Sequence, residues 1–309
     1  MVPVSIVILS YNRLDEIKKN LTLIVEESKT ENEFELIIVD NNSNDGTREF
    51  LIKFCALHKS IILELTDVNL GVAVGKNIGF AKASREFIVA LDNDTEISTK
   101  DLRRIPDLFS EHEDVGILAF KVLHPLTGEL QNPFGNIGCE VANYHGAGCA
   151  FRRELLNSLG GISQERDYGG DELDFSIRVR NAGWGIRYTP EITILHNSLI
   201  RDSSNEKWRI ERWTWNFLTI FFTYFPFRMA MLYSFRFFMP LFFYYIKHFG
   251  IRNLFTILDA ALRGIQYGRK MHKPVSKATI IYYQNKNLRP DLGNVPLILK
   301  LLNKLRRRL

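Results

Sequence analysis

Two aspartates separated by one residue follow a short apolar run in the first third of the chain. Val89–Leu91 has the composition of a buried strand, and Asp92, Asn93 and Asp94 come directly after it. Because side chains alternate along a strand, carboxylates at i and i+2 project to the same side and repel each other unless a cation compensates them. Mg²⁺ and Mn²⁺ prefer such oxygen ligands. The pair therefore predicts a site that holds a nucleotide diphosphate through a divalent metal; the alternative is an ordinary turn rich in Asp and Asn.

A second group of carboxylates lies at the start of a predicted helix. Asp171, Glu172 and Asp174 follow two glycines, and residues 173–181 are expected to form a helix that Gly183 ends. Carboxylates in a first helical turn interact favourably with the helix dipole, which is the structural interpretation. The functional interpretation is that one of them acts as a general base toward a hydroxyl group.

The elements that must position these residues follow a regular alternation. Strands are predicted over residues 4–9, 34–39, 61–65 and 86–91, and helices over 14–27, after Thr47, and from Gly71 to about Ser84. The second helix is expected to turn Phe50, Phe54 and Leu57 inward. Glycines at 71, 75 and 79 allow close approach to a sheet or a ligand. The pattern predicts an α/β fold with a mostly parallel sheet and helices on both faces.

Polar residues follow three of the predicted strands: Ser10-Tyr11-Asn12, Asp40-Asn41-Asn42 and Asp92-Asn93-Asp94. Parallel sheets of this kind bind ligands at the carboxyl ends of their strands, so the three clusters are expected to meet at one edge. A glycine-rich dinucleotide motif does not follow the first strand, and the sequence has no Walker lysine motif. Hydride transfer and a P-loop are therefore disfavoured.

Composition narrows the class of protein further. The chain has 309 residues, a formal charge of +5 and three cysteines without metal-binding spacing. The charge suits a phosphate-bearing substrate or an anionic membrane surface and does not indicate nucleic acid. The cysteine count argues against a disulfide framework and for a reducing compartment. The first residues lack a basic region, so no secretory signal is expected and a cytoplasmic location is predicted.

At this point the chain resembles the family 2 inverting glycosyltransferases with the GT-A fold. The resemblance covers roughly residues 3–200 and is carried by six motifs and a histidine in the expected order. These are S-Y-N-R at 10–13, V-D-N-N-S-N-D-G-T at 39–47, L-G-V-A-V-G-K-N-I-G-F at 70–80, L-D-N-D-T at 91–95, G-A-G-C-A-F-R-R-E at 146–154, G-G-D-E-L-D-F-S-I-R-V-R-N-A-G-W at 169–184, and His196. Rhamnosyl- and galactofuranosyl-transferase-type enzymes of surface polysaccharide synthesis are the most similar members.

The resemblance implies a nucleotide site at the edge of the sheet. Tyr11 would stack on the base and Asp40 would accept a hydrogen bond from its imide, which suits uracil or thymine. Lys76 and Asn77 would line the ribose and diphosphate, and Asp92 would contact the ribose. The other nucleotide-binding residues implied by the motifs are Ser10, Asn12, Arg13, Asn42 and Asn93.

The resemblance also implies where the metal and the transfer chemistry lie. Asp94 would ligate Mg²⁺ or Mn²⁺, with His196 at the metal or diphosphate. The family usually has Glu-Asp where this chain has Asp171-Glu172, so the base would be Glu172, with Asp171 as the alternative. Four further residues are assigned to the acceptor or donor sugar: Gly148, Arg152, Asp174 and Trp184. For Arg152 the alternative is a solvated residue before a helix over 154–159. The segment 122–144, which includes Gln131, is interpreted as the acceptor-side loop.

The composition changes near residue 207. Residues 217–249 contain half of the chain's 22 phenylalanines, interrupted by Arg228 and Arg236 and by two prolines. A transmembrane helix needs about 20 apolar residues without such breaks. We therefore expect a glycosyltransferase domain over 1–207 and a helical region over 208–309 that lies in a membrane interface, with a basic end at 304–309 that attracts anionic lipid. The alternative is a homo-oligomer surface or a helical cap.

The sequence thus predicts a metal-dependent inverting glycosyltransferase at the inner face of the cell membrane. It would move a sugar from a UDP- or dTDP-linked donor to a hydroxyl of a glycan or lipid-linked acceptor. Two alternatives remain: a nucleotidyltransferase that makes the sugar nucleotide, and a catalytically silent nucleotide-binding module. The sequence names neither the donor sugar nor the acceptor.

Overall fold

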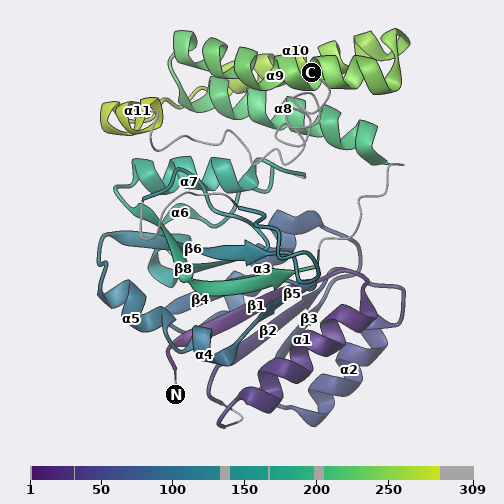
Figure 1. Cartoon of the computed structure of the whole chain (residues 1–309), viewed down its shortest axis with the longest axis vertical. Helices are drawn as coiled ribbons and strands as arrows, with labels where there is room; N and C mark the ends of the chain where they lie inside the picture. The colour runs from purple at the N-terminus through teal and green to yellow at the C-terminus, as the bar shows by residue number, and fades with distance from the viewer. Residues whose placement is uncertain (1, 31, 133–139, 166–167, 198–204, 286–309) are drawn as a thin grey trace.

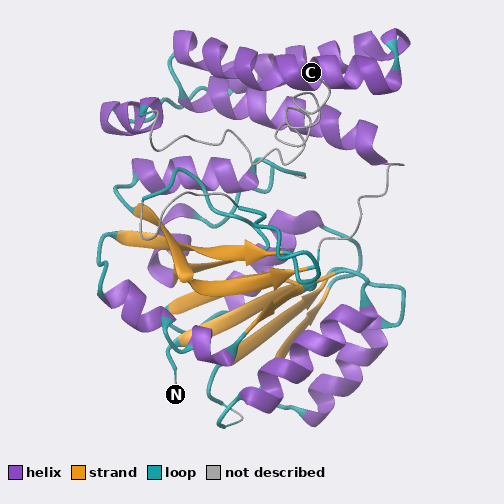
Figure 2. Cartoon of the chain, viewed as in Figure 1, coloured by secondary structure: helices purple, strands orange, loops and turns teal. Residues whose placement is uncertain are grey.

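The computed structural model describes residues 2–30, 32–132, 140–165, 168–197 and 205–285 (Figure 1). A curved sheet lies between two layers of helices, and a group of long helices lies beyond one of these layers (Figure 2). The α/β fold with a C-terminal aromatic helical region is therefore confirmed. The predicted basic end at 304–309 lies outside the described residues.

The first half of the sheet is parallel, as the alternating pattern predicts. Its strands pair in the order β3-β2-β1-β4. Their bounds are Val4–Ser10 for β1, Glu35–Asp40 for β2, Ile62–Leu65 for β3 and Phe87–Asp92 for β4, each within one residue of the prediction. Parallel register brings Ser10 beside Asp40 and Leu9 beside Asp92, so the polar strand ends meet at one edge.

The second half of the sheet is mixed. It contains β5 (Thr95–Ile97), β6 (Val115–Leu123), β7 (Gly148–Arg152) and β8 (Gly185–His196), and the full order is β3-β2-β1-β4-β7-β6-β8-β5. Strand β7 runs antiparallel to both β4 and β6, which the sequence pattern did not predict. Because of this reversal, the start of β7 lies beside the end of β4. The residues before β7 therefore lie at the same edge of the sheet as Asp92, and those after β7 do not.

The two faces of the sheet bury separate cores. Ile6 and Ile8 of β1 face α1 (Leu14–Glu27), whereas Val7 faces α3 (Gly71–Lys82). Helices α2 (Thr47–Leu57), α4 (Thr99–Leu102) and α5 (Ile105–Ser110) join the α1 face, and α6 (Arg153–Leu159) and α7 (Asp171–Asn181) join the α3 face. One expectation is wrong here: Leu57 is 80% exposed because α2 ends at this residue.

Helix α3 lies unusually close to the sheet. A Cβ added at Gly79 would meet Val7 Cγ1 at 2.3 Å, and one at Gly75 would meet Leu9 Cδ1 at 2.4 Å. The sequence left open whether these glycines allow close approach to a sheet or to a ligand. In the structure, Gly75 and Gly79 approach the sheet. The close approach brings Lys76 of the same helix to the end of β4.

Helix α7 is covered on two sides. Phe175 and Val179 belong to the core under the sheet, whereas Leu173 and Ile177 pack into the aromatic core of the C-terminal helices. Those helices are α8 (Glu206–Tyr224), α9 (Phe227–Phe249), the 3-10 turn η2 (Ile251–Asn253), α10 (Leu254–Lys270) and α11 (Lys277–Gln284). The start of α7, with its carboxylates, is therefore held between the sheet and α8 (Figure 1).

Candidate functional site

The loops after β1 and β2 are locked together by amide side chains. Asn93 Nδ2 donates to the backbone carbonyl of Asn12 at 2.9 Å, and Asn12 Oδ1 accepts from the backbone N–H of Asn44 at 2.9 Å. Asn12 and Arg13 have left-handed φ values of 56° and 68°. The Asn12 and Asn93 side chains thus shape the rim of the predicted nucleotide site through contacts with the protein itself. Tyr11, on the same loop, is 44% exposed.

Asp40 is fully buried at the end of β2. Its Oδ2 atom accepts from the backbone N–H of Ser43 and from Arg48 Nη1, at 3.2 and 3.3 Å. Its Oδ1 atom has no hydrogen-bond partner in the described part of the chain, and the same holds for Ser10 Oγ beside it. A buried acceptor without a donor is costly, so this pair fits a ligand N–H. The nearby Asn42 is exposed and also left-handed, with φ 67°.

Asp92, Asp94 and His196 form a group that could hold a metal ion. One ligand atom from each residue lies within 4.8 Å of the others. The group arises because β5 pairs antiparallel with β8, so Thr95 lies beside His196. The backbone N–H of Asn197 also donates to the Asp94 carbonyl at 3.0 Å.

Gln131 fixes the orientation of the His196 ring. Its Nε2 atom donates to the His196 backbone carbonyl at 3.0 Å, so Oε1, which lies 2.7 Å from His196 Nδ1, must accept from that nitrogen. The lone pair of the neutral ring then resides on Nε2, 3.5 Å from Asp94 Oδ2. The Nε2 lone pair and the Asp94 carboxylate oxygen both donate electron pairs, so a positively charged ion between them is favourable. The donor set and its outer partner therefore fit a divalent cation.

Two protein cations compensate the aspartates. Arg13 Nη1 lies 2.5 Å from Asp94 Oδ2, and Lys76 Nζ lies 2.8 Å from Asp92 Oδ1 and 2.6 Å from the Gly146 carbonyl. Burial disfavours the charge of Lys76, but the Asp92 carboxylate outweighs burial and keeps the pKa of Lys76 above its usual value. Burial likewise works against the Asp92 charge, and Lys76 overcomes it, so the pKa of Asp92 is lowered.

Asp171 and Glu172 open α7 on the other side of Lys76. The pKa of Glu172 is raised well above its usual value, first by burial and then by the neighbouring Asp171 carboxylate. The pKa of Asp171 is also raised, mainly by burial. A Cβ added at Gly146 would lie 2.6 Å from Glu172 Oε1. Gly146 thus contacts Glu172 while its carbonyl binds Lys76, and a poorly solvated carboxylate lies next to the strand-edge aspartates.

Arg152 and Trp184 lie at the opposite edge of the sheet from this site. Arg152 pairs with Phe87 at the start of β4, and its guanidinium donates to the backbone carbonyls of Phe109 and Val115 at 2.7 and 2.8 Å. The Trp184 ring packs against the same guanidinium. The expectation that these two residues reach a sugar is corrected: they hold α5 and β6 against β7.

Two further predicted residues hold the scaffold. Asp174 accepts from Arg178 Nε at 2.9 Å and from the Tyr224 hydroxyl at 3.0 Å, so it ties α7 to α8 and does not face the site. Asn77 exchanges two hydrogen bonds with the backbone of Ile162, which fully engages its amide in the loop after α6. Both side chains thus contact the scaffold, and the acceptor and nucleotide roles expected for them stay predictions.

Gly148 lies at the site edge of the sheet, paired with Leu91. A Cβ there would meet Ile194 Cδ1 at 2.4 Å, so the residue is required for packing between strands. The structure brings together the remaining predicted residues: Ser10, Tyr11, Asn12, Arg13, Asp40, Asn42, Lys76, Asp92, Asn93, Asp94, Asp171, Glu172 and His196.

Sequence reasoning did not assign Arg48, Gly146 or the contact of Gln131 with His196. Gly146 belongs to the glycine pair at 146 and 148, which was a usable signal. Nothing in the local pattern connects Gln131 with a histidine 65 positions later.

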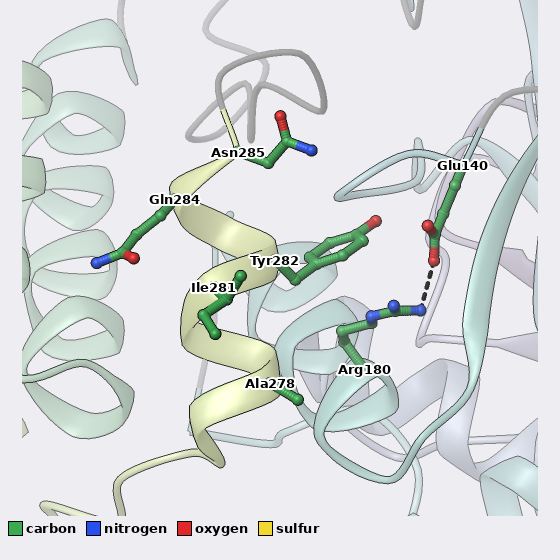
Figure 3. Close-up of a pocket in the computed structure, with 7 residues that line it drawn as sticks. All are labelled: Glu140, Arg180, Ala278, Ile281, Tyr282, Gln284 and Asn285. Atoms are coloured by element: carbon green, nitrogen blue, oxygen red, sulfur yellow. Dashed lines mark hydrogen bonds and ion pairs between the residues drawn. The ribbon is translucent and has the colours of Figure 1, made fainter.

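A cavity of about 550 Å³ lies elsewhere, between the end of α7 and α11 (Figure 3). Arg180 pairs with Glu140 at its wall and stacks on the Tyr282 ring. None of the predicted site residues lines it.

Family models match most of the chain. A model described as glycosyl transferase family 2 matches residues 5–160, and one described as glycosyl transferase family group 2 matches residues 87–285. Among curated proteins, the chain is 29% identical to glycosyltransferase AglE of Haloferax volcanii over 62% of this chain and 66% of AglE. It is 32% identical to TuaG of Bacillus subtilis, a putative teichuronic acid biosynthesis glycosyltransferase, over 29% of this chain and 35% of TuaG.

Solved structures share the fold at low sequence identity. The S. aureus TarS 1–349 complex with UDP-GlcNAc has a TM-score of 0.61 and 15% identity, covering 98% of this chain and 92% of TarS 1–349. The mannosyltransferase PcManGT from Pyrobaculum calidifontis, in complex with GDP-Man and Mn²⁺, has a TM-score of 0.55 and 20% identity, covering 93% of this chain and 82% of that one.

The adjacent carboxylates at 171 and 172 are expected to make stability depend on pH. Their folded-state pKa values are raised, so the protonated forms suit the fold, and stability is lost as pH rises through these pKa values. Asp171→Asn removes one of two neighbouring charges and should raise Tm by about 2 °C near pH 8. The gain should be smaller near pH 4, because protonation weakens the repulsion that the substitution relieves. Scanning calorimetry at both pH values measures this; a gain of equal size at both would contradict it. Glu113→Gln, which changes a carboxylate outside the site, is the control.

Proposed function

Because the chain belongs to glycosyl transferase family 2, we propose that it is an inverting transferase that uses a UDP- or dTDP-linked sugar. The acceptor is a hydroxyl group of a glycan or a lipid-linked glycan. The observation that carries the proposal is that one edge of the sheet brings together two groups of residues suited to different tasks. A possible cation group, Asp92, Asp94 and His196, lies on one side of Lys76, and a carboxylate with a raised pKa, Glu172, lies on the other.

The nucleotide base binds between the first two loops. The exposed Tyr11 ring supplies a stacking surface, and the unpartnered Asp40 Oδ1 accepts the imide N–H of uracil or thymine. A purine with an exocyclic amine would present a different donor pattern. Arg48 Nη1 lies 3.3 Å from Asp40 Oδ2 and holds the carboxyl group in place, with Oδ1 left as the acceptor.

Asp94 and His196 would hold Mg²⁺ or Mn²⁺, with Asp92 toward the ribose. When bound, the cation neutralises charge on the departing nucleoside diphosphate. Gln131 keeps the His196 lone pair on Nε2, directed at the site. Arg13 occupies one Asp94 oxygen and must share or release it when the donor arrives, after which its guanidinium can bind phosphate.

Glu172 acts as the general base. Burial and the Asp171 carboxylate raise its pKa, and a more basic carboxylate is a better acceptor for the proton of a hydroxyl group in the transition state. Lys76 contacts both Asp92 and the Gly146 carbonyl, and Gly146 packs against Glu172, so the strand end and the helix start are linked through these contacts. The sugar transferred is proposed to be a hexose or deoxyhexose of the rhamnosyl or galactofuranosyl type.

Nucleotide binding tests the donor site directly. UDP or dTDP with Mn²⁺ should raise Tm of the full chain, because a ligand that binds only the folded state stabilises it. Asp94→Asn should remove the Mn²⁺ dependence of this shift, and Gln131→Ala should weaken Mn²⁺ affinity about tenfold or more in an EPR titration. Glu96→Gln, two residues further along the chain in β5, is the matched control. A shift with GDP alone, or one that Asp94→Asn leaves unchanged, would refute the donor site as described.

Turnover tests the assignment of the base and separates the alternative functions. In a screen of nucleotide sugars, Glu172→Gln should lose at least about 100-fold in transfer or donor hydrolysis, the usual contribution of a general base. The same variant should keep the nucleotide-dependent Tm shift. An active Glu172→Gln enzyme would sink this role. Pyrophosphate release from UTP and a sugar 1-phosphate would indicate a nucleotidyltransferase, and binding without any turnover would indicate a silent module.

The C-terminal helices support a proposal about location. In the described part of the chain, α9 alone is long and apolar enough to cross a membrane by length and composition. One side of α9 is buried in the aromatic core, whereas Phe227, Phe235 and Phe243 on the other side are about 62% exposed. On α10, Phe255 is 82% exposed. A helix with one side buried in protein and the other apolar suits the interface of a bilayer better than a span.

Basic residues complete this surface. Arg228 and Arg236 of α9 and Arg252 of η2 are exposed beside the aromatic stripe, which suits anionic headgroups. We place the protein at the cytoplasmic face of the membrane, with residues 208–309 as the interface region.

Vesicle binding tests this location. The full chain should sediment with vesicles of phosphatidylcholine containing phosphatidylglycerol, and more weakly with phosphatidylcholine alone. Phe235→Ser with Phe243→Ser should lower the vesicle affinity at least about tenfold, because two large apolar side chains no longer insert. Leu57→Ser, which replaces an equally exposed apolar residue on α2, should have no effect. Equal binding by the double variant, or no sedimentation of the wild type, would contradict the proposal.

A further inference from the structure

Three aromatic side chains gather beside the start of α7. The Tyr168 ring lies 5.2 Å from the Trp208 ring, and 6.1 Å from the Trp213 ring with an interplanar angle of 17°. Tyr168 precedes Asp171 by three residues, and the two tryptophans belong to the first turns of α8. Trp208 is 46% exposed, whereas the other two rings are half-buried. We call Tyr168, Trp208 and Trp213 the aromatic platform.

The platform is held rigidly relative to Glu172. Asn216 Nδ2 donates to the backbone carbonyls of Tyr168 and Gly169, both at 2.9 Å. The Trp213 indole packs so closely that a Cβ on Gly169 would lie 2.4 Å from its Nε1. Gly169 and Gly170 are both left-handed, with φ 73° and 87°, and lead directly into Asp171. Trp213 and Asn216 therefore anchor the segment that ends in the catalytic carboxylates.

Trp208 has no comparable structural role. It touches the platform through Tyr168 and leaves nearly half of its surface in water, where a large apolar ring gains nothing from packing. Two guanidiniums flank the rings: Arg209 Cζ lies 5.8 Å from the Tyr168 ring and Arg212 Cζ lies 5.9 Å from the Trp208 ring. Flat aromatic surface beside guanidinium donors is a lining that suits small polar ligands with an apolar face.

The platform lies on the Glu172 side of the site, away from the loops that carry Tyr11 and Asp40. In Figure 1, the first turns of α8 lie above the edge at which the strands end, beyond the start of α7. An acceptor must present its hydroxyl to Glu172 from the side opposite the departing diphosphate. We propose that the aromatic platform is the acceptor subsite, in which a sugar ring stacks on Trp208 and places a hydroxyl at Glu172. This inference rests on the proposed function and specifies its acceptor as a glycoside.

Glycoside binding tests the platform without knowledge of the natural acceptor. The probes are the methyl glycosides of glucose, galactose, mannose and N-acetylglucosamine, added to the full chain with UDP and Mg²⁺ and measured by saturation-transfer NMR. At least one should bind the wild type. Trp208→Ala should weaken that binding about tenfold, since stacking on an aromatic face contributes about that factor. Trp208→Phe, which keeps a ring, should recover most of it, and Trp184→Phe at the opposite edge should leave it unchanged.

The outcomes separate the two proposals. Absence of binding by all four glycosides, or equal binding by Trp208→Ala, overturns the subsite. Loss of the UDP-dependent Tm shift in Trp208→Ala also overturns it, because the platform would then serve the donor. A wild-type protein that binds glycosides in a Trp208-dependent way but never binds a nucleotide retains the sugar subsite and refutes the glycosyltransferase donor site.

Discussion

The contact between Lys76 and Asp92 is the interaction on which the rest of the site depends. Four carboxylates, Asp92, Asp94, Asp171 and Glu172, converge at the end of β4. The buried Lys76 ammonium contacts Asp92 at the strand end and is near enough to the helix start for the Asp171 charge to act on it. Burial of one ammonium among these carboxylates is favourable because the charges are paired, and it leaves Glu172 as the carboxylate with the least compensation. The site is therefore arranged for one stable anion at Asp92 and one readily protonated carboxylate at Glu172.

The distance between these two halves is set by packing far from either. Gly75 and Gly79 let α3 approach β1, which brings Lys76 to the strand edge. Helix α7 is held from the other side by the Asp174–Tyr224 hydrogen bond and by Asn216, so the aromatic helices position Glu172 as much as the sheet does. The C-terminal region thus has a structural role in the proposed catalytic site, and it also has the exposed aromatic face that we propose contacts a bilayer. The two tryptophans of the aromatic platform lie on α8, whereas the exposed phenylalanines of the aromatic stripe lie on α9.

The parallel half of the sheet was predictable because it depends on local patterns. Short apolar runs end in polar clusters, and parallel register alone brings Ser10, Asp40 and Asp92 to one edge. The antiparallel β7 was not predictable, because its partners β4 and β6 are distant in sequence and its apolar run fits either direction. That reversal explains why Arg152 does not reach the site: as the last residue of β7 it lies at the edge where β4 begins. Asp174 was assigned to the acceptor side because it follows two other carboxylates at the start of a predicted helix. Its hydrogen bonds with Arg178 and Tyr224 are visible only in the tertiary structure.

By itself, the sequence determined the α/β class and the polar residues that follow the parallel strands. It also determined the carboxylate pair at 171–172 and the apolar character of the C-terminal region. All of these follow from residue types at short spacing, where the backbone period fixes which side chains share a face. Tertiary structure alone decided that Lys76 neutralises Asp92, that Gln131 sets the tautomer of His196, and that Trp208 packs against Tyr168, just before the start of α7. Each of these joins residues brought together by strand pairing or helix docking. Such contacts depend on the closure of long loops, and no local pattern in the chain records them.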